Sequence, residues 1–272
     1  NTLLDEKETR RRLGYVAQDV AIDKILTGRE LLQLQGDLYH LDKKHKKKRI
    51  DELIQRLDMH EWIDRRCGSF SGGMKRRLDL ASGLLHEPEL LILDEPTVGL
   101  DIESRSVIWG LLKELRKKET TILLSSHYLE EVDELADEMA IIDKGKVIAS
   151  GKPDDMKKEL GGDRVTLRVR EFSDEAEAES VRKLIRNING VSNVVVNQKQ
   201  GYSLNFLVKS NDVISNLSSH LSKENFEVFA LSHSRPSLDD VYLQATGKTL
   251  MDAELELAGK RDIKLENKKS MR

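Results

Sequence analysis

The feature that most constrains this chain is the stretch from Ser71 to Asp101, which reads SGGMKRRLDLASGLLHEPELLILDEPTVGLD. The segment after the Ser-Gly-Gly turn has apolar residues at helical spacing, which predicts a helix over Gly73–His86. A hydroxyl and glycine N–H groups at the positive end of a helix dipole can bind an anion, although such a turn by itself is more often only a capped helix start. The apolar stripe comprises Met74, Leu78, Ala81 and Leu85, with Lys75, Arg76 and Arg77 outside it.

A continuous apolar run, Leu90–Leu93, follows this helix. It is typical of a strand buried on both faces of a parallel sheet. Asp94 and Glu95 come at its carboxyl end, where open α/β sheets bind ligands. Asp94 suits Mg²⁺, directly or through water, and Glu95 can orient and deprotonate a water that attacks a γ-phosphate. An acidic pair after a strand is usually a solvated turn, but the spacing from Ser71 favours a site for a phosphate and a metal.

Together, SGGMKRRLDLAS and LILDEPTVGLD resemble the signature helix, Walker B strand and D-loop of ATP-binding cassette (ABC) ATPases. The similarity is greatest to the ABC-2, drug-export (daunorubicin-resistance-like) subfamily. It implies that Asp94 is the Walker B carboxylate and Glu95 the catalytic base. It also implies nucleotide-binding residues: Ser71, Gly72 and Gly73, which would close over ATP held by a partner subunit, and Asp101 at the dimer interface. Met74 stands where many ABC proteins have Gln.

The same resemblance gives roles to two residues that follow other strands. Gln18 comes after the predicted strand Leu13–Ala17 and would be the Q-loop glutamine, which touches Mg²⁺ or the attacking water. His127 comes after the predicted strand Thr121–Leu124 and would be the switch histidine, which contacts the γ-phosphate and holds Glu95 and the water in register. Without the resemblance, each would be read as a polar loop residue.

Charge and cysteine content limit the partners. The chain has 45 Lys and Arg against 48 Asp and Glu, so no global field favours nucleic acid, and no nucleic-acid partner is expected. The basic run Lys43–Arg49 reads as a solvated helix start or as a contact with anionic lipid.

A single cysteine, Cys67, excludes an internal disulfide, and no apolar run approaches the ~20 residues of a membrane span. We expect a cytoplasmic protein that is peripheral at the inner face of the cell membrane through a partner.

The sequence predicts two domains and a tail. Residues 1–160 are expected to form an α/β, P-loop NTPase-like ABC ATPase core with a helical subdomain at about 27–86, which begins at the Thr27–Glu30 capping box. Residues 163–247 show the βαββαβ order of a small ferredoxin-like α+β domain, whose last strand is expected at Phe226–Leu231. Their segment PSLDDVYLQATG resembles the closing motif of the subfamily's accessory domain, with a regulatory or dimer-supporting role. Residues 248–272 read as a charged tail with a helix around 253–258.

A phosphate-binding Walker A loop, G-x-x-x-x-G-K-[ST], does not occur in these residues. Gly247-Lys248-Thr249 does not qualify, because the first glycine would fall at Tyr242 and the triplet follows a predicted helix. In the family this loop precedes the Q-loop. We therefore expect it upstream of Asn1, so that the core is incomplete at its N-terminus and the chain alone binds ATP poorly and is inactive.

Three functional hypotheses follow. The leading one is the nucleotide-binding (ATPase) subunit of an ABC-2 type exporter, which uses ATP and Mg²⁺, pairs with a second ATPase subunit and acts through a membrane-spanning permease. The alternative is a non-catalytic, regulatory or degenerate subunit that completes a partner's ATP site. ABC ATPases that act on DNA or the ribosome are disfavoured, because the chain has neither long coiled-coil arms nor two cassettes. The residues do not identify the exported substrate.

Overall fold

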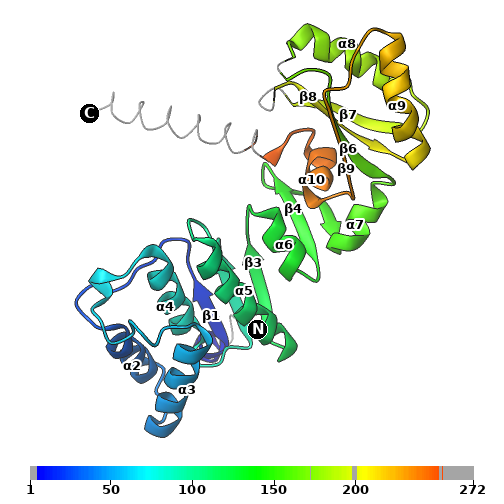
Figure 1. Cartoon of the computed structure of the whole chain (residues 1–272). Helices are drawn as coiled ribbons and strands as arrows, with labels where there is room; N and C mark the ends of the chain where they lie inside the picture. The colour runs from blue at the N-terminus through cyan, green and yellow to red at the C-terminus, as the bar shows by residue number, and fades with distance from the viewer. Residues whose placement is uncertain (1–4, 172, 198–200, 251–252, 254–272) are drawn as a thin grey trace, which may run out of the picture. The chain divides into compact units, whose positions relative to one another are not determined.

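The computed structural model describes residues 5–171, 173–197, 201–250 and 253. The chain divides into two compact units, Asn1–Tyr128 and Leu129–Arg272; among the described residues the first contains one sheet and the second two (Figure 1).

A three-stranded parallel sheet organises the first unit. Its strands are β1 (Leu13–Val16), β2 (Leu90–Asp94) and β3 (Thr121–Ser125), in the order β1-β2-β3. The register sets Asp94 beside Ser125, so the polar residues that follow the two strands meet at one carboxyl edge. Helix α4 (Gly72–Leu84) packs against β1 at a glycine pair, where a Cβ on Gly14 would lie 2.5 Å from the Gly83 carbonyl oxygen.

The helices of this unit begin at side-chain caps. They are α1 (Glu6–Arg12), α2 (Gly28–Leu38), α3 (Lys43–Arg56), α4 and α5 (Ile102–Lys117), with a 3₁₀ turn at Cys67–Ser69. The predicted Thr27–Glu30 capping box is confirmed at α2. Ser71 caps α4 by accepting from the Met74 N–H at 3.2 Å, and Asp101 caps α5 by accepting from the Ser104 N–H at 2.7 Å. Such caps each contribute about 1 kcal/mol of stability.

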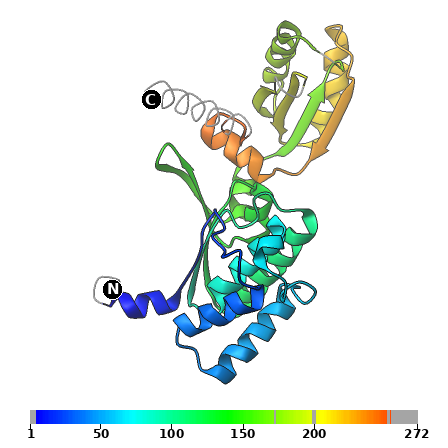
Figure 2. The same ribbon diagram turned by 90° about the vertical axis from the view of Figure 1, so that its left-hand side faces the viewer.

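Helix α3 begins with exposed side chains and ends with buried ones. Its core face is buried at Ile50, Leu53 and Ile54, followed by Leu57. Most of the basic run that opens the helix is exposed, but Arg49 is buried and donates to the Leu84 carbonyl at 3.2 Å. Figure 2 shows α2 and α3 side by side.

Two expectations based on apolar spacing are wrong. Arg76, expected outside the buried stripe of α4, is itself buried, because that flank of the helix faces the loops after β1 and β2. The strand β2 is not fully buried on both faces: Leu91 and Leu93 are buried, while Leu90 and Ile92 are only partly buried. Figure 2 shows the helices of the first unit on one face of the sheet, and on the other face Tyr15 and Leu123 are each 59% exposed.

The second unit begins with a hairpin of β4 (Met139–Asp143) and β5 (Lys146–Gly151). Lys144 and Gly145 both have positive φ at its turn, the conformation that matches the twist of a tight hairpin. Three helices pack around one apolar cluster beside it: α6 (Leu129–Leu135), α7 (Pro153–Glu159) and α10 (Leu238–Thr246). The buried members of this cluster are Ile141, Met156, Leu238 and Val241.

The rest of the second unit is the predicted ferredoxin-like βαββαβ layer. Its elements are β6 (Asp163–Arg168), α8 (Glu175–Arg186), β7 (Val191–Asn197), β8 (Ser203–Val208), α9 (Asn211–Lys223) and β9 (Ala230–Ser234). The four strands pair antiparallel in the order β7-β8-β6-β9. Buried residues from β6, α8 and β8, including Val165, Ile185 and Phe206, form its core.

The last strand lies later in the chain than its apolar pattern predicts. The run Phe226–Leu231 suggested the strand, but only Ala230–Ser234 pairs with β6, in register with Arg168–Arg164. Phe226 and Val228 instead pack against the core from the segment that precedes the strand. The helix predicted around 253–258 lies, beyond residue 253, outside the described residues.

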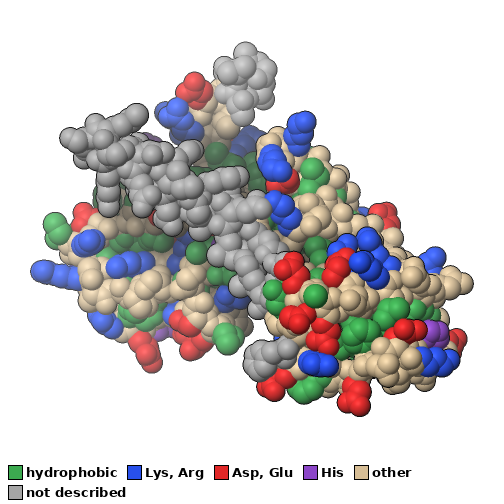
Figure 3. Space-filling model, turned by 90° about the horizontal axis from the view of Figure 1, so that it is seen from above, with side chains coloured by type: hydrophobic (Ala, Val, Ile, Leu, Met, Phe, Trp, Pro, Cys, Tyr) green, Lys and Arg blue, Asp and Glu red, His purple; other side chains and the backbone are tan. Residues whose placement is uncertain are grey.

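The surface mixes charges of both signs. On the face shown in Figure 3, Lys and Arg side chains are interspersed with Asp and Glu over the described residues. Exposed ion pairs such as Arg10–Glu6, at 2.8 Å, contribute about 0–1 kcal/mol each. Within the ranges the structure describes, no helix is both long and apolar enough to cross a bilayer.

Candidate functional site

The carboxyl edge of the parallel sheet brings Glu95 and His127 into direct contact. Glu95 Oε2 lies 2.7 Å from His127 Nδ1 and also accepts a bond from the His127 backbone N–H at 3.4 Å. The Glu95 side chain is 19% exposed and that of His127 35%, so the pair is shielded yet reachable from solvent. The 2.7 Å distance suits a hydrogen bond in which Nδ1 donates to the Glu95 carboxylate.

Ser125 joins the same edge, although no sequence motif assigns it a role. Its hydroxyl donates to Asp94 Oδ1 at 2.5 Å and accepts from the Glu95 N–H at 3.1 Å. The Ser125 carbonyl accepts from that N–H at 3.1 Å as well. The only available signal was its place at the end of the predicted strand, and its pairing with Asp94 depends on the strand register.

Glu95 has an uncommon backbone conformation. Its φ of +50° lies in the left-handed region, which costs a non-glycine residue about 1–2 kcal/mol. Such a conformation persists where surrounding contacts determine it, and here the N–H is bonded to Ser125 while the carbonyl accepts from Arg76 at 2.8 Å. The turn after β2 is therefore held from both sides.

Arg76 is the most extensively bonded side chain at this edge. Its guanidinium donates to the Asp94 and Glu95 carbonyls at 2.8 Å each and to the Pro96 carbonyl at 2.8 Å. It also donates to the Ala17 carbonyl and, at 3.4 Å, to the Gln18 carbonyl. The carboxylate of Asp79 lies 3.6 Å away. These acceptors offset the several kcal/mol that burying an unpaired charge would cost.

Gln18 lies just beyond β1, which ends at Val16, one residue earlier than the predicted strand end. The residue is exposed, and its carbonyl is one of the Arg76 acceptors. Because β1 and β2 are parallel neighbours, Gln18 is at the same sheet edge as Asp94.

The signature residues form a second cluster, with Asp101. Ser71 and Gly72 are exposed at the start of α4, and the space beyond the Gly72 Cα is open. Gly73 is buried. A Cβ at this position would lie 2.5 Å from Ser104 Oγ, so a larger residue would not fit without a shift of its neighbour. Asp101 is exposed, and the bond from the Ser104 N–H lowers the pKa of its carboxyl.

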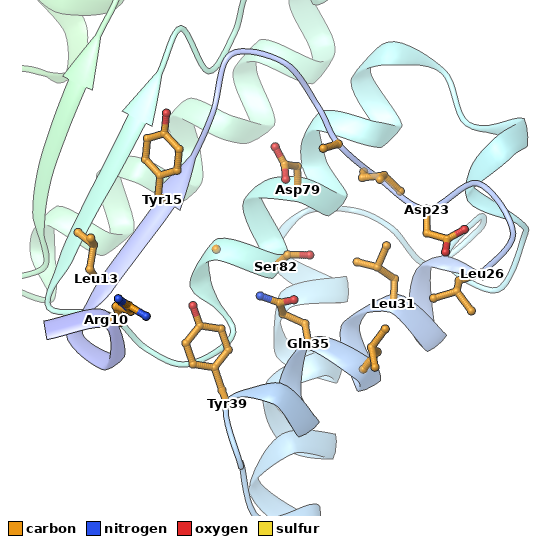
Figure 4. A pocket seen from close by; sticks show the side chains of 14 residues that line it. Arg10, Leu13, Tyr15, Asp23, Leu26, Leu31, Gln35, Tyr39, Asp79 and Ser82 are labelled. Carbon is orange, nitrogen blue, oxygen red and sulfur yellow. The ribbon is translucent and has the colours of Figure 1, made fainter. Parts of the chain in front are cut away.

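A separate cavity of about 520 Å³ lies where β1, α2 and α4 meet. Figure 4 shows Asp79 and Ser82 from α4 and Gln35 from α2 around it, with Tyr15 from β1. Burial raises the pKa of Asp79 to about 6, against the lowering effect of Arg76. None of the site residues predicted from the sequence lines this cavity.

Two regions of the chain match known protein families. Residues 2–98 match the family described as ABC transporter. Residues 151–246 match the C-terminal domain of ATP-binding proteins like DrrA1-3. The first match lies within the stretch expected to form the ATPase core, and the second begins at residue 151, twelve residues before the expected start of the accessory domain.

Individual relatives cover most of the chain. The daunorubicin resistance ATP-binding protein DrrA3 of Streptomyces coeruleorubidus is 37% identical over 238 residues, which span 88% of this chain and 73% of that protein. The linearmycin resistance ATP-binding protein LnrL of Bacillus subtilis is 34% identical over 90% of this chain and 79% of that protein. A solved ATP-binding subunit of an ABC transporter superimposes with a TM-score of 0.54 and 28% identity, over 59% of this chain and 67% of that one. With these matches and the sheet edge that joins Glu95 to His127, the chain belongs to the ATP-binding subunits of ABC transporters, in the drug-export subfamily of the daunorubicin resistance proteins.

Proposed function

We propose that this chain binds and hydrolyses ATP at the carboxyl edge of the β1-β2-β3 sheet and thereby drives an ABC-2 type exporter. The observation that carries the proposal is the 2.7 Å contact between Glu95 and His127. Glu95 orients and deprotonates the attacking water, and His127 holds the Glu95 carboxylate in place. Because Nδ1 of His127 contacts Glu95, Nε2 is the ring nitrogen that would face a γ-phosphate.

Mg²⁺ is the metal proposed for this edge. Within the described residues, no group of three or more His, Cys, Asp or Glu side chains gathers to enclose a metal. Mg²⁺ needs only one or two carboxylates when phosphates and water complete its shell, and Asp94 beside the Ser125 hydroxyl fits that requirement. Asp94, with Gln18, would hold the ion, which would neutralise charge on the phosphates.

A second copy of the chain is the proposed partner at the signature turn. Ser71 and Gly72 are exposed at the N-terminus of a 13-residue helix, where backbone N–H groups and the helix dipole favour a phosphate. They would close over ATP held by that copy, with Asp101 at the interface.

The phosphate-binding loop of this site would come from a segment outside the 272-residue chain, because the chain does not contain the motif. The exposed face of the parallel sheet offers a place for such a segment. Tyr15, Ile92 and Leu123 form one row across the three strands, and the flanking Tyr15 and Leu123 are each 59% exposed. We infer that a segment with the loop covers this row, and that the chain without it hydrolyses no ATP.

The remaining partners follow from the subfamily. We infer a membrane-spanning ABC-2 permease that contacts the helical subdomain at about 27–86, which would place the protein in the cytoplasm at the membrane. The ATPase domain would run to about residue 160 and the accessory domain from 163 to 247, with a regulatory or dimer-supporting role and a charged tail at 248–272.

The test replaces Glu95 by Gln in the product of the full open reading frame that encodes this chain. Loss of the base should lower kcat for ATP hydrolysis by about 10²–10⁴-fold while ATP binding persists. The matched control is Glu89→Gln, an exposed glutamate at the opposite end of β2 that pairs with Arg12. Phosphate release and binding of a fluorescent ATP analogue report the two properties. Normal hydrolysis by Glu95→Gln would refute the catalytic assignment.

The same experiment separates the alternative function. The missing phosphate-binding motif is the observation that favours a non-catalytic subunit. If the full product neither binds nor hydrolyses ATP alone, yet accelerates hydrolysis by an intact partner subunit through Ser71, the alternative is correct.

A further inference from the structure

Arg76 connects three parts of the site that are far apart in the sequence. It lies on α4, five residues after Ser71, and its acceptors follow two different strands. Two are the consecutive carbonyls of Ala17 and Gln18 after β1, and three are the consecutive carbonyls of Asp94, Glu95 and Pro96.

Each nitrogen of the Arg76 guanidinium donates to at least one backbone carbonyl. A guanidinium has five N–H donors in a fixed planar fork, and five carbonyl oxygens surround this one. The side chain is 5% exposed, so water does not compete for these bonds. Lysine has three donors at a single atom and cannot span both loops in this way.

We propose that Arg76 is a positioning residue that holds Gln18 and Glu95 in their active geometry and links them to the signature turn. The proposal rests on the function proposed above and adds a means of coupling. Because Ser71 and Arg76 are on one rigid helix, about 7–8 Å apart along its axis, a nucleotide that shifts the signature turn also shifts the fork. The fork in turn controls the left-handed Glu95 backbone.

A residue with a purely structural role should affect the stability of the fold but not the Glu95 backbone. Arg77, the next residue, is a matched control: its guanidinium donates to the Leu57 and Asp58 carbonyls at 3.2 and 3.1 Å and lies over the Trp62 ring. Those contacts hold α4 to the segment after α3 and do not reach the sheet edge. Arg77→Lys should therefore affect the stability of the fold without affecting Glu95.

The first measurement uses this chain without nucleotide. Amide hydrogen exchange by NMR should show that Arg76→Lys lowers the protection of the Glu95 amide by about tenfold or more, since the loss of one or two charged hydrogen bonds frees the turn. The Lys75 amide, which is bonded to the Ser71 carbonyl at 3.0 Å, should change less than about threefold. Arg77→Lys should change the protection of the Glu95 amide by less than about threefold. If Arg76→Lys does not fold, Arg76→Gln takes its place.

The second measurement uses the product of the full reading frame with ATP. Arg76→Lys should lower kcat by about tenfold or more while KM for ATP stays within about threefold, because the fork acts on Glu95 and the water and not on overall binding. Unchanged protection of Glu95, or unchanged kcat despite lost protection, would overturn the positioning role. If the wild-type product hydrolyses no ATP, the proposed function fails, and the exchange result alone then decides whether Arg76 holds the two strand ends.

Discussion

Asp79 shows how burial changes the chemistry of a single residue. It lies one turn after Arg76 on α4, its side chain is 23% exposed, and burial raises the pKa of its carboxyl to about 6. The nearby guanidinium lowers that pKa but does not cancel the cost of burial. At neutral pH the folded protein therefore holds a carboxylate that would be more stable in water.

This carboxyl predicts a specific pH dependence of stability. Its folded pKa is above the ordinary value of 3.8, so the folded state binds the proton more strongly. The contribution to stability is present below pH 4 and is lost as pH rises through about 6. Asp79→Asn should therefore stabilise the chain relative to wild type by roughly 2 kcal/mol more at pH 7.5 than at pH 4.5. Urea unfolding at both pH values measures this difference, and an equal effect at the two would contradict it.

At the residue scale, family motifs identified candidate site residues in the sequence, but the burial of individual side chains could not be predicted from it. The resemblance to ABC ATPases, rather than strand position, gave Glu95 and His127 neighbouring roles; the structure puts their side chains in contact, and their catalytic roles stay predictions. Arg76 could not be identified, because helical periodicity treats a basic residue beside an apolar stripe as solvated. Its burial depends on two loops that only the assembled sheet brings near α4.

Among the elements, α4 depends on close approach to α5. Gly73 is the contact point, where a Cβ would lie 2.5 Å from Ser104 Oγ and 3.2 Å from Ser104 Cβ. The neighbouring Gly72 has nothing within 4 Å of the same position. The two adjacent glycines therefore differ: Gly73 allows α4 to pack closely against Ser104 of α5, whereas Gly72 leaves the outer surface of the turn open.

Alanine substitutions separate these reasons. Gly73→Ala should lower the free energy of unfolding by about 1 kcal/mol, since an overpacking cost of about 1–3 kcal/mol exceeds the gain in helix propensity. Gly72→Ala should be neutral or slightly stabilising. Chemical denaturation measures both, and Gly73→Ala combined with Ser104→Ala should recover part of the loss. Equal effects at the two glycines would show that the Ser104 contact does not limit packing.

The elements themselves were largely predictable, with errors at their boundaries. Caps mark the starts of α2 and α4, because Thr27 and Ser71 act through local backbone geometry. The last strand was predicted too early in the chain because Phe226 and Val228, which lie before the strand, pack against the core without pairing in the sheet. Its pairing is fixed by β6, a partner more than 60 residues away, which no local pattern contains.

For the whole molecule, the ferredoxin-like layer has a core of its own. Residues of β6, α8, β8 and α9 fill it, while α10 contributes Leu238 and Val241 to the cluster around Ile141. A domain limit at residue 247 would thus retain a helix whose apolar face belongs to another cluster. The sequence could not show this division, because α10 follows β9 directly in the chain.

Fragments of this region test that division. Residues 163–235 alone should unfold cooperatively, and residues 163–247 should be within about 1 kcal/mol of the same stability, because the Arg164–Asp240 pair at 3.5 Å is the kind of part-exposed contact that contributes little. Circular dichroism during urea titration measures both. A shorter fragment that unfolds without cooperativity would mean that α10 is essential to the layer.

The alignment of Asp94 with Ser125 also limits how the encoding gene can change. Extra codons between α5 and β3 would lengthen a turn and leave the strands matched. One extra codon within β3 would invert every later side chain of that strand, since neighbours point to opposite faces. Ser125 would then turn away from Asp94, so length variation among descendants of this protein should accumulate in the turn and be absent from the strand.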